Sequence, residues 1–330
     1  MECFLEGRKS PLSKKDQVYI DKLRNLILES VQSSVSKIKR PFATLLSGGA
    51  DSGVLTAIAK PDIALTCRFP YGSKYDEFQS TLKTVKHVGV KHEVIVPKKK
   101  DFFKYIEDAI LALGRTTIHF SLVPLYILFK RAREIGIKTV FSGEGPDEYL
   151  AGYTSYIYLD HEEKLFSRPE LDNYHYSLEQ YTGDRINRVA RILKLNPELV
   201  KKNFGKYKSI LSNLGYCDLK LRGITEMELA MAKRFNIRLL YPYMNKKIED
   251  FCFKKVPDNL KIRNFTTKWI FRKVAEQYIP KEVVWRLNKM GGPVAPVGKW
   301  LGQKSEFDKT IYLNLQRHIL KGGSLKTFKF

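Results

Sequence analysis

Cysteine, acidic residues and long apolar runs are all scarce in this chain of 330 residues. The four cysteines, Cys3, Cys67, Cys217 and Cys252, show no CxxC pairing, which is typical of reduced thiols rather than of a disulfide framework. No apolar run reaches the ~18 residues that a membrane-spanning helix needs, and the opening residues lack the apolar core of a signal peptide. The sequence therefore predicts a cytoplasmic protein without a membrane partner.

Two catalytic patterns are also missing. The sequence contains no GxxxxGK[ST] pattern, so a Walker-type NTPase is not supported. The six histidines show no HExxH or paired-ligand spacing, so we expect no zinc site. Because hydrophobic residues make up 43% of the chain, we expect a globular protein rather than a disordered one.

The shortage of acidic residues leaves a formal net charge of +23, with 58 Lys and Arg against 35 Asp and Glu. Residues 1–150 contain 24 Lys and Arg against 17 Asp and Glu, and residues 151–330 contain 34 against 18. The basic excess therefore lies mainly in the C-terminal half. Such a balance attracts polyanions, including nucleic acid and nucleotides. Since no nucleic-acid-binding module is recognisable, we favour a lysine-rich solvated surface, and nucleic acid is a possible but not a favoured partner.

Strand and helix patterns alternate up to about residue 150. After a helical pattern at 14–39, the buried-strand patterns lie at 42–46, 63–69, 92–96 and 138–142, and the intervening helices lie at 74–87, 101–113 and 121–135, with a short helix ending near Pro61. This alternation predicts an α/β fold with a parallel twisted sheet and flanking helices.

Beyond Tyr153 the pattern is mainly helical, and no strand alternation is convincing there. The helical stretches lie near 177–195, 197–212, 223–236, 245–254, 266–278 and 298–320. We therefore predict an N-terminal helical segment at 1–39, an α/β core at 40–155 and a C-terminal helical lobe at 156–330 that completes the active site.

The first predicted strand ends in the turn 47-SGGADS-52. Gly48 and Gly49 would let the backbone approach an anion closely, because the amides that open a helix point their N–H groups at it. The hydroxyls of Ser47 and Ser52 could add donors to phosphate oxygens. Asp51 would be repelled by bare phosphate but could hold a bridging Mg²⁺. The alternative is a tight turn with an N-cap serine.

A second turn, 142-SGEGPDEYLAGY-153, follows the last predicted strand. Ligands of parallel sheets bind at the carboxyl ends of strands, where both turns fall. Three carboxylates stand in the second turn, at Glu144, Asp147 and Glu148. Asp147 could give Mg²⁺ a second oxygen, and Glu144 would then be free for proton transfer. Taken alone, such a loop is usually a solvated turn.

Together, SGGxDS and SGExxDExxxGY resemble the synthetase domain of the asparagine synthetase family, within the N-type ATP pyrophosphatases. Further matches follow in the same order and span roughly residues 40–300. They are Tyr75-Asp76-Glu77, His92-Glu93, Ser121 to Pro124, Lys268 to Arg272, and Pro280 with Trp285-Arg286 and Lys289.

This resemblance implies an adenine nucleotide alpha-hydrolase-like fold and a ligase that activates a carboxylate with ATP. An acyl-adenylate and pyrophosphate would form, and an amine would then attack to give an amide and AMP. The implied Mg²⁺ ligands are Asp51 and Asp147, and the implied catalytic residues are Glu144 and Lys289. The implied ATP-binding residues are Leu46, Ser47, Gly48, Gly49, Asp51, Ser52, Cys67, Ser142, Gly143 and Lys268.

The chain also departs from this family. We expect no glutaminase domain like that of glutamine-hydrolysing members, because Cys3 does not match its nucleophile, and we therefore expect ammonia, a separate glutaminase subunit or another amine to supply nitrogen. Asn236 and Asn245 replace two acidic residues of the family, which leaves aspartate or a related acid open as the carboxylate. The alternatives are a ligase for a larger substrate (a peptide, a natural-product acid such as a β-lactam precursor, or tRNA) and a non-catalytic relative.

Overall fold

The computed structural model describes residues 12–72, 76–157, 187, 189–190, 196–221, 225–286, 296–302 and 309–329. The chain divides into two compact units, each assembled from three segments. Unit 1 contains residues 1–30, 144–224 and 243–277, and unit 2 contains residues 31–143, 225–242 and 278–330. The three contiguous segments expected from the sequence, 1–39, 40–155 and 156–330, stay a prediction.

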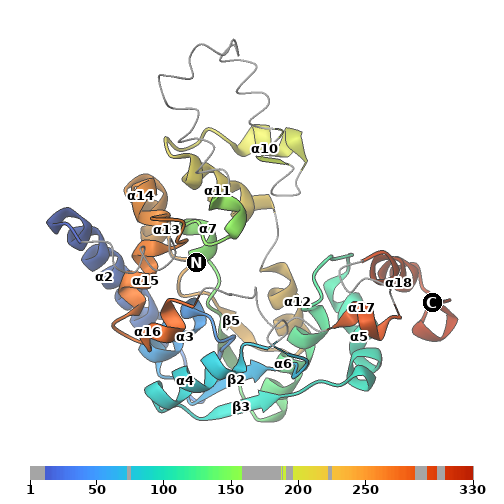
Figure 1. Cartoon of the computed structure of the whole chain (residues 1–330). Helices are drawn as coiled ribbons and strands as arrows, with labels where there is room; N and C mark the ends of the chain where they lie inside the picture. Colours follow the sequence, from blue (N-terminus) through green and yellow to red (C-terminus); the bar gives the residue numbers. More distant parts are fainter. Residues whose placement is uncertain are drawn as a thin grey trace. The chain divides into compact units, whose positions relative to one another are not determined.

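Unit 2 is built around a parallel sheet of five strands (Figure 1). The strands are β1 Ala43–Leu45, β2 Ile63–Cys67, β3 His92–Ile95, β4 Thr139–Phe141 and β5 Arg238–Leu240. Their order is β3-β2-β1-β4-β5, and every neighbouring pair is parallel. The predicted fold class, a parallel sheet with flanking helices, is confirmed.

The central strand β1 aligns the two turns that the sequence singled out. Leu45 of β1 lies opposite Leu65 of β2, and Thr44 lies opposite Phe141 of β4. One residue beyond the strands, the Leu46 amide donates to the Leu65 carbonyl at 2.9 Å and the Ser142 amide donates to the Leu240 carbonyl at 2.9 Å. The turns after β1 and β4 therefore start side by side at the carboxyl ends of adjacent strands.

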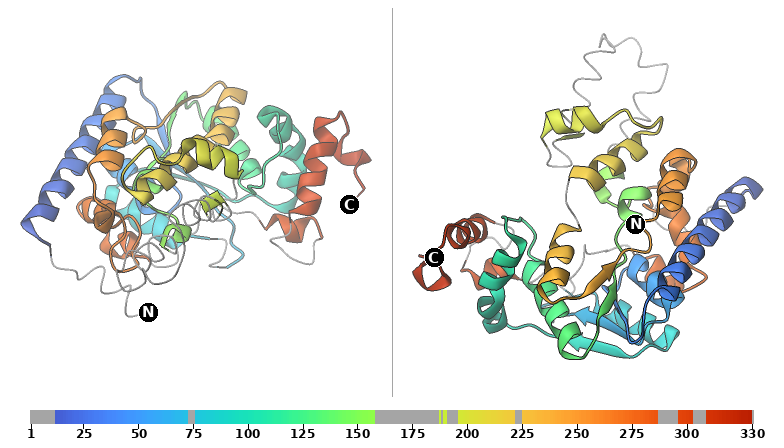
Figure 2. Two further views of the ribbon diagram at one scale, coloured as in Figure 1. Left: turned by 90° about the horizontal axis from the view of Figure 1, so that it is seen from above. Right: turned by 180° about the vertical axis from the view of Figure 1, so that it is seen from behind.

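Helices cover both faces of this sheet, as the views in Figure 2 show. Successive side chains of a strand point to opposite faces. Ala43 of β1 belongs to a large apolar core with four helices, α5 Lys99–Leu113, α6 Leu122–Glu134, α12 Glu226–Arg234 and α18 Thr310–Leu320. Thr44, on the other face, is hydrogen-bonded to Thr56 of α3 (Ala50–Ala59) at 2.9 Å between the hydroxyl oxygens. Unit 2 also contains α4 Phe78–Val88, α16 Lys281–Val284, α17 Val297–Trp300 and the 3₁₀ helix η2 Leu325–Thr327.

Within its described residues, unit 1 is helical. It contains α7 Pro146–Tyr149, α10 Pro197–Asn203, α11 Ile210–Leu221, α13 Lys246–Lys254, α14 Asp258–Lys261 and α15 Trp269–Ala275, while α2 Lys14–Ser36 begins in unit 1 and ends in unit 2. Its apolar core includes Tyr156, Leu214 and Cys217, all fully buried. Helix α11 supplies four residues of this core, Ile210, Leu211, Leu214 and Cys217, because its apolar residues recur every three or four positions.

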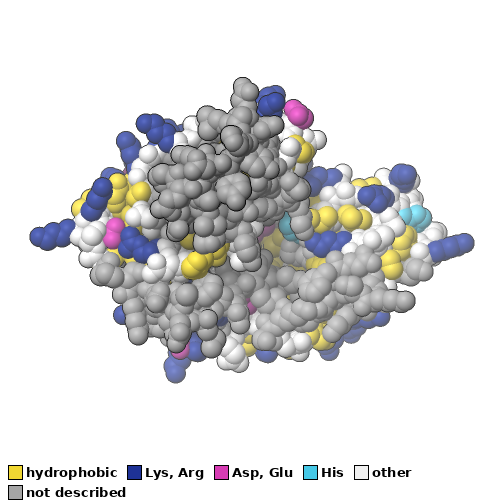
Figure 3. Space-filling view, turned by 45° about the horizontal axis from the view of Figure 1, so that its top comes forward, with side chains coloured by type: hydrophobic (Ala, Val, Ile, Leu, Met, Phe, Trp, Pro, Cys, Tyr) yellow, Lys and Arg dark blue, Asp and Glu magenta, His cyan; other side chains and the backbone are white. Residues whose placement is uncertain are grey.

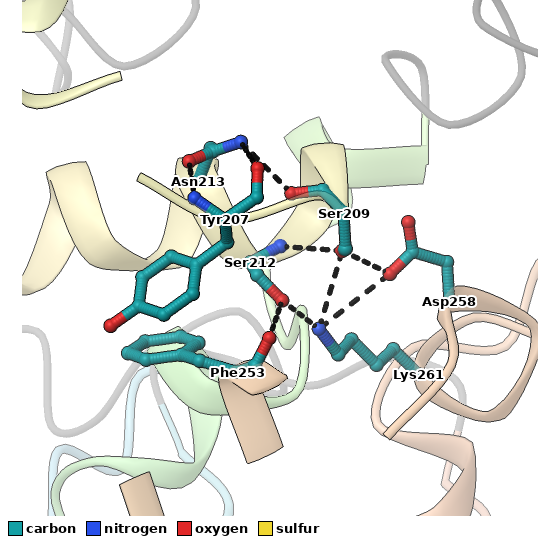
Figure 4. A network of polar contacts seen from close by, with 7 residues as sticks. All are labelled: Tyr207, Ser209, Ser212, Asn213, Phe253, Asp258 and Lys261. Atoms are coloured by element: carbon teal, nitrogen blue, oxygen red, sulfur yellow. Dashed lines mark hydrogen bonds and ion pairs between the residues drawn. The ribbon is translucent and has the colours of Figure 1, made fainter. Parts of the chain in front are cut away.

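A buried lysine joins three helices of unit 1 (Figure 4). Lys261 Nζ donates to Ser212 Oγ and lies 3.5 Å from Asp258 Oδ1, and Ser212 Oγ donates to the Phe253 carbonyl at 2.8 Å. Burial lowers the pKa of Lys261. The Ser209 hydroxyl accepts from the Ser212 amide at 3.0 Å at the start of α11 and donates to Asp258. These bonds fix the start of α11 to α14 and to the end of α13.

The structure corrects part of the element prediction. Strand β5 lies beyond Tyr153, where we expected no strand, because its three residues are too few to show alternation. One predicted helix at 197–212 is two helices, since α10 ends at Asn203 and α11 starts at Ile210. The predicted helix at 177–195 falls largely outside the described residues.

Within the described part of the chain, no helix has the length and apolarity to cross a bilayer. Cys67, Cys217 and Cys252 are unbridged and buried, as expected for reduced thiols, and Cys3 lies outside the described residues.

Candidate active site

The first turn of the candidate site joins β1 to α3 in unit 2. Gly49 caps α3 in an extended conformation without a side-chain capping bond, and its amide donates to Ser47 Oγ at 3.4 Å. The Ser47 amide donates to Ser52 Oγ at 3.1 Å, and the two hydroxyl oxygens also lie 3.1 Å apart. Asp51 stands in the first turn of α3 and is buried. The turn thus presents helix-opening amides with two hydroxyls beside them, the donor set that a phosphate requires.

Close packing dictates the glycine at position 48. Gly48 has a φ of +87°, and a Cβ built there would lie 2.8 Å from the Glu77 carbonyl oxygen and 2.8 Å from Thr81 Oγ1. A larger residue would therefore collide with the start of α4 and would strain the backbone.

The second turn packs directly against the first. A Cβ on Gly143 would lie 3.1 Å from the Ser52 amide nitrogen, so the two backbones are in contact within unit 2. Ser142 is buried and donates from Oγ to Glu228 Oε1 at 3.1 Å. The nine predicted ATP-binding residues of unit 2 therefore lie together at the carboxyl ends of β1, β2 and β4. They are Leu46, Ser47, Gly48, Gly49, Asp51, Ser52, Cys67, Ser142 and Gly143.

The second motif continues into unit 1, where Asp147 meets Lys268. Lys268 Nζ lies 2.7 Å from Asp147 Oδ1, and the lysine side chain is 2% exposed. Lys268 precedes α15 with a φ of +51°, in the left-handed region. The buried lysine and the half-buried carboxylate are thus held as one ion pair.

Local contacts also explain why the motif ends in Gly152 and Tyr153. A Cβ on Gly152 would lie 1.8 Å from Asp147 Oδ1 and 2.7 Å from its Cα, so a glycine is needed beside this carboxylate. The Tyr153 hydroxyl donates to Glu148 Oε1. Glu148 is fully buried, and burial, together with the neighbouring Asp147 carboxylate, raises its pKa to about 7. Glu144, two residues before α7, is half-buried.

Sequence reasoning missed Glu228. It stands on α12, is buried, and has a pKa raised to about 7 by burial, although the bond from Ser142 favours the charged form. A single glutamate on an amphipathic helix normally faces solvent, so no pattern marked it. Its hydrogen bond with Ser142 depends on the tertiary packing of α12 beside β4, which the sequence does not reveal.

The predicted catalytic Lys289 lies outside the described residues. Among the residues that the structure describes, no three His, Cys, Asp or Glu side chains form a metal-binding group. Mg²⁺ is usually held by one or two carboxylates together with substrate phosphates and water. The acidic side chain of Asp51, at the turn after β1, suits that mode of binding.

Asn236 and Asn245, which depart from the family pattern, and Arg68 after β2 all have local structural explanations. Asn245 caps α13, where its side chain accepts from the Lys247 amide at 2.9 Å. Asn236 has a φ of +52°, a conformation that asparagine tolerates better than most residues do. Arg68 pairs with Asp76 at 2.8 Å. These residues therefore have structural roles apart from recognition of a carboxylate substrate.

Comparison with known proteins identifies one family. The family model described as asparagine synthase matches residues 22–315. The chain is 24% identical to asparagine synthetase [glutamine-hydrolyzing] 1 of Bacillus subtilis (strain 168), over 94% of this chain and 54% of that protein. It is 23% identical to asparagine synthetase B [glutamine-hydrolyzing] of Escherichia coli (strain K12), over 81% and 43%. The chain thus spans about half the length of the curated relatives it matches.

Two solved structures show weaker similarity. NMN synthetase from Francisella tularensis is 15% identical with a TM-score of 0.31, covering 66% of this chain and 97% of that one. The U34-tRNA thiolase NcsA from Methanococcus maripaludis is 12% identical with a TM-score of 0.33, covering 86% and 88%.

Replacing Glu228 with glutamine should flatten the pH dependence of stability. The folded state keeps a proton on Glu228 up to about pH 7, whereas an unfolded glutamate releases it near 4.5, so the unfolding free energy falls as the pH rises between these values. The loss is at most about 3 kcal/mol, and Glu228→Gln should remove it. Urea unfolding at several pH values between 5 and 8 measures the slope.

Glu226→Gln is the matched control, because Glu226 stands on the same helix with an exposed side chain paired to Arg115. It should keep the wild-type slope. An unchanged slope in Glu228→Gln would show that Glu228 is ionised throughout this range.

A methyl group at position 152 should displace Asp147. Because its Cβ would overlap the carboxylate and the backbone of Asp147, Gly152→Ala should lower the unfolding free energy by about 1–3 kcal/mol. The neighbouring Ala151 has a φ of +57°, so Ala151→Gly should be tolerated. Thermal denaturation measures the melting temperatures of both variants. Equal melting temperatures for Gly152→Ala and wild type would contradict the packing argument.

Proposed function

The chain belongs to the asparagine synthase family, and from that premise we propose that it is an ATP-dependent ligase that forms an amide. In the proposed reaction, a carboxylate attacks ATP to give an acyl-adenylate and pyrophosphate, and ammonia or another amine then displaces AMP. The observation that carries the proposal is the contact between the two strand-end turns. It gathers helix-opening amides and two serine hydroxyls at one end of the sheet.

This arrangement supports the ATP-binding roles that the family resemblance implies. Backbone amides of Gly48 and Gly49, with Ser47 and Ser52, would hold the pyrophosphate end of the nucleotide. The buried strand ends at Leu46, Cys67 and Ser142, together with the half-buried Gly143, would lie against the adenosine. Burial raises the pKa of the Cys67 thiol, so this cysteine would act as an apolar wall rather than as a nucleophile.

Mg²⁺ would neutralise phosphate charge, with Asp51 and Asp147 as its proposed ligands. Three residues separate Gly143 from Asp147 along the motif. The 2.7 Å contact between Lys268 and Asp147 fixes the carboxylate, and the same ammonium would donate to a nucleotide oxygen.

Glu144 and Lys289 are the proposed catalytic residues. The amine must lose a proton as it attacks, and the half-buried Glu144 carboxylate could accept it. Charge develops on the acyl oxygen during the same step, and the Lys289 ammonium could stabilise it. The amine would be ammonia, whether free or delivered by a separate glutaminase subunit, or an amino group of another molecule.

A ligase for a larger substrate is the second candidate, and the net charge of +23 favours it. On the face drawn in Figure 3, Lys and Arg side chains of the described residues are scattered rather than gathered into one patch. On this face, scattered charge suits a solvated surface better than a tRNA-binding site. We place a small carboxylate first because the chain belongs to the asparagine synthase family.

The proposal is tested by incubating the purified chain with ATP, Mg²⁺, ammonium and a panel of carboxylates that starts with aspartate. AMP and pyrophosphate should appear in equal amounts, and the correct carboxylate should support exchange of labelled pyrophosphate into ATP. Asp51→Asn should reduce this exchange by about 100-fold or more, because the Mg²⁺ that binds the phosphates would lose a negatively charged ligand.

Asp62→Asn serves as the control, since Asp62 is a partly buried aspartate of the same unit at the opposite end of β2. It should keep wild-type exchange. Formation of ADP and phosphate, or equal exchange in the Asp51 variant and wild type, would refute the proposed function.

A further inference from the structure

The segment that covers the phosphate-binding turn carries negative charge. Asp76 and Glu77 come directly before α4, and the Glu77 carbonyl oxygen closes over Gly48. The same oxygen accepts from the amides of Ser80 and Thr81 at 3.0 and 3.3 Å, so it is fixed to the first turn of α4. A displacement of this segment would therefore change the space around the turn.

One arginine holds this segment from the C-terminal part of unit 2. Arg286 Nη2 lies 2.6 Å from Glu77 Oε1, and Arg286 Nη1 donates to Ser80 Oγ at 2.9 Å. The Glu77 side chain is 7% exposed and that of Arg286 is 22% exposed, so the pair is largely shielded from water. An arginine with two partners fixes orientation as well as charge.

A second arginine holds the segment from the end of β2. Arg68 Nε lies 2.8 Å from Asp76 Oδ2, and its guanidinium carbon lies 4.2 Å from the centroid of the Phe78 ring. The Asp76 carboxylate also accepts from the Phe78 amide at 3.0 Å. The Arg68 amide is itself bonded to the Ile95 carbonyl at 2.9 Å, which ties this arginine to the sheet.

We propose that Arg68 and Arg286 are positioning residues of the nucleotide site. They hold Asp76 and Glu77 so that the segment stays seated on Gly48, and they neutralise two carboxylates that would otherwise repel a triphosphate. The inference rests on the proposed function, because it takes the turn after β1 to be the ATP site.

A matched control pair exists beside this site. Lys83 of α4 lies 2.8 Å from Glu282 of α16, so it joins α4 to the segment that leads to Arg286. The two side chains are 48% and 59% exposed, and an ion pair so exposed contributes little.

Titration calorimetry with ATP and Mg²⁺ tests the inference on the whole chain. Arg286→Gln and Arg68→Gln should each raise the Kd for ATP by about 10- to 100-fold, the size of effect seen when supporting partners of a site are removed. Arg286→Lys keeps the charge but cannot contact Glu77 and Ser80 at the same time, as the arginine does. Its Kd for ATP should therefore fall between those of Arg286→Gln and wild type. Lys83→Gln should bind ATP as wild type does.

A kinetic readout separates positioning from a general loss of structure. In pyrophosphate exchange, Arg286→Gln should raise the KM for ATP while changing kcat by less than about 3-fold, because the arginine does not touch the reacting atoms. Glu77→Gln should give a smaller rise in Kd, because it breaks the contact without leaving an unpaired carboxylate, and the double variant should be no worse than Arg286→Gln alone.

The outcomes distinguish the inference from the proposed function. If wild type binds ATP and all variants bind within about 2-fold of it, the arginines are not positioning residues. If kcat falls as much as the affinity, or if Lys83→Gln weakens binding equally, the inference is also overturned. If wild type does not bind ATP, the proposed function fails first, and the inference falls with it.

Discussion

Parallel pairing of β1 with β4 is the constraint on which the candidate site depends. It brings the two glycine turns, which are almost a hundred residues apart in the sequence, to adjacent strand ends. The pairing leaves so little room that the turn at Gly143 rests on the backbone of Ser52. In another register, the helix-opening amides of α3 and the strand end at Ser142 would not lie next to each other.

Close backbone approach recurs throughout the site, and it explains the motifs better than side-chain chemistry alone does. Gly48 admits the Glu77 carbonyl, and Gly152 admits the Asp147 carboxylate. Gly215 of α11 has the same function, since a Cβ there would lie 1.8 Å from the Glu148 carbonyl oxygen. The Lys261 network fixes the start of that helix, so α11 forms a rigid support under α7.

The sequence revealed the fold to the extent that its signals are local. Buried strands alternating with helices predicted four strands and their parallel pairing, whereas β5 has three residues and gave no periodic signal. The glycine turns predicted the residues now found at the strand ends. Glu228 could not be predicted, because its role follows from a contact with Ser142 across 86 residues. The same holds for the contacts of Arg68 and Arg286, which depend on tertiary packing.

The central claim is that the turn after β1 binds the triphosphate of ATP. A structure of the chain with a non-hydrolysable ATP analogue and Mg²⁺ tests it most directly. We expect phosphate oxygens within hydrogen-bond distance of the amides of Gly48 and Gly49, with the metal ion on Asp51. A nucleotide bound elsewhere, or phosphates directed away from the start of α3, would contradict it.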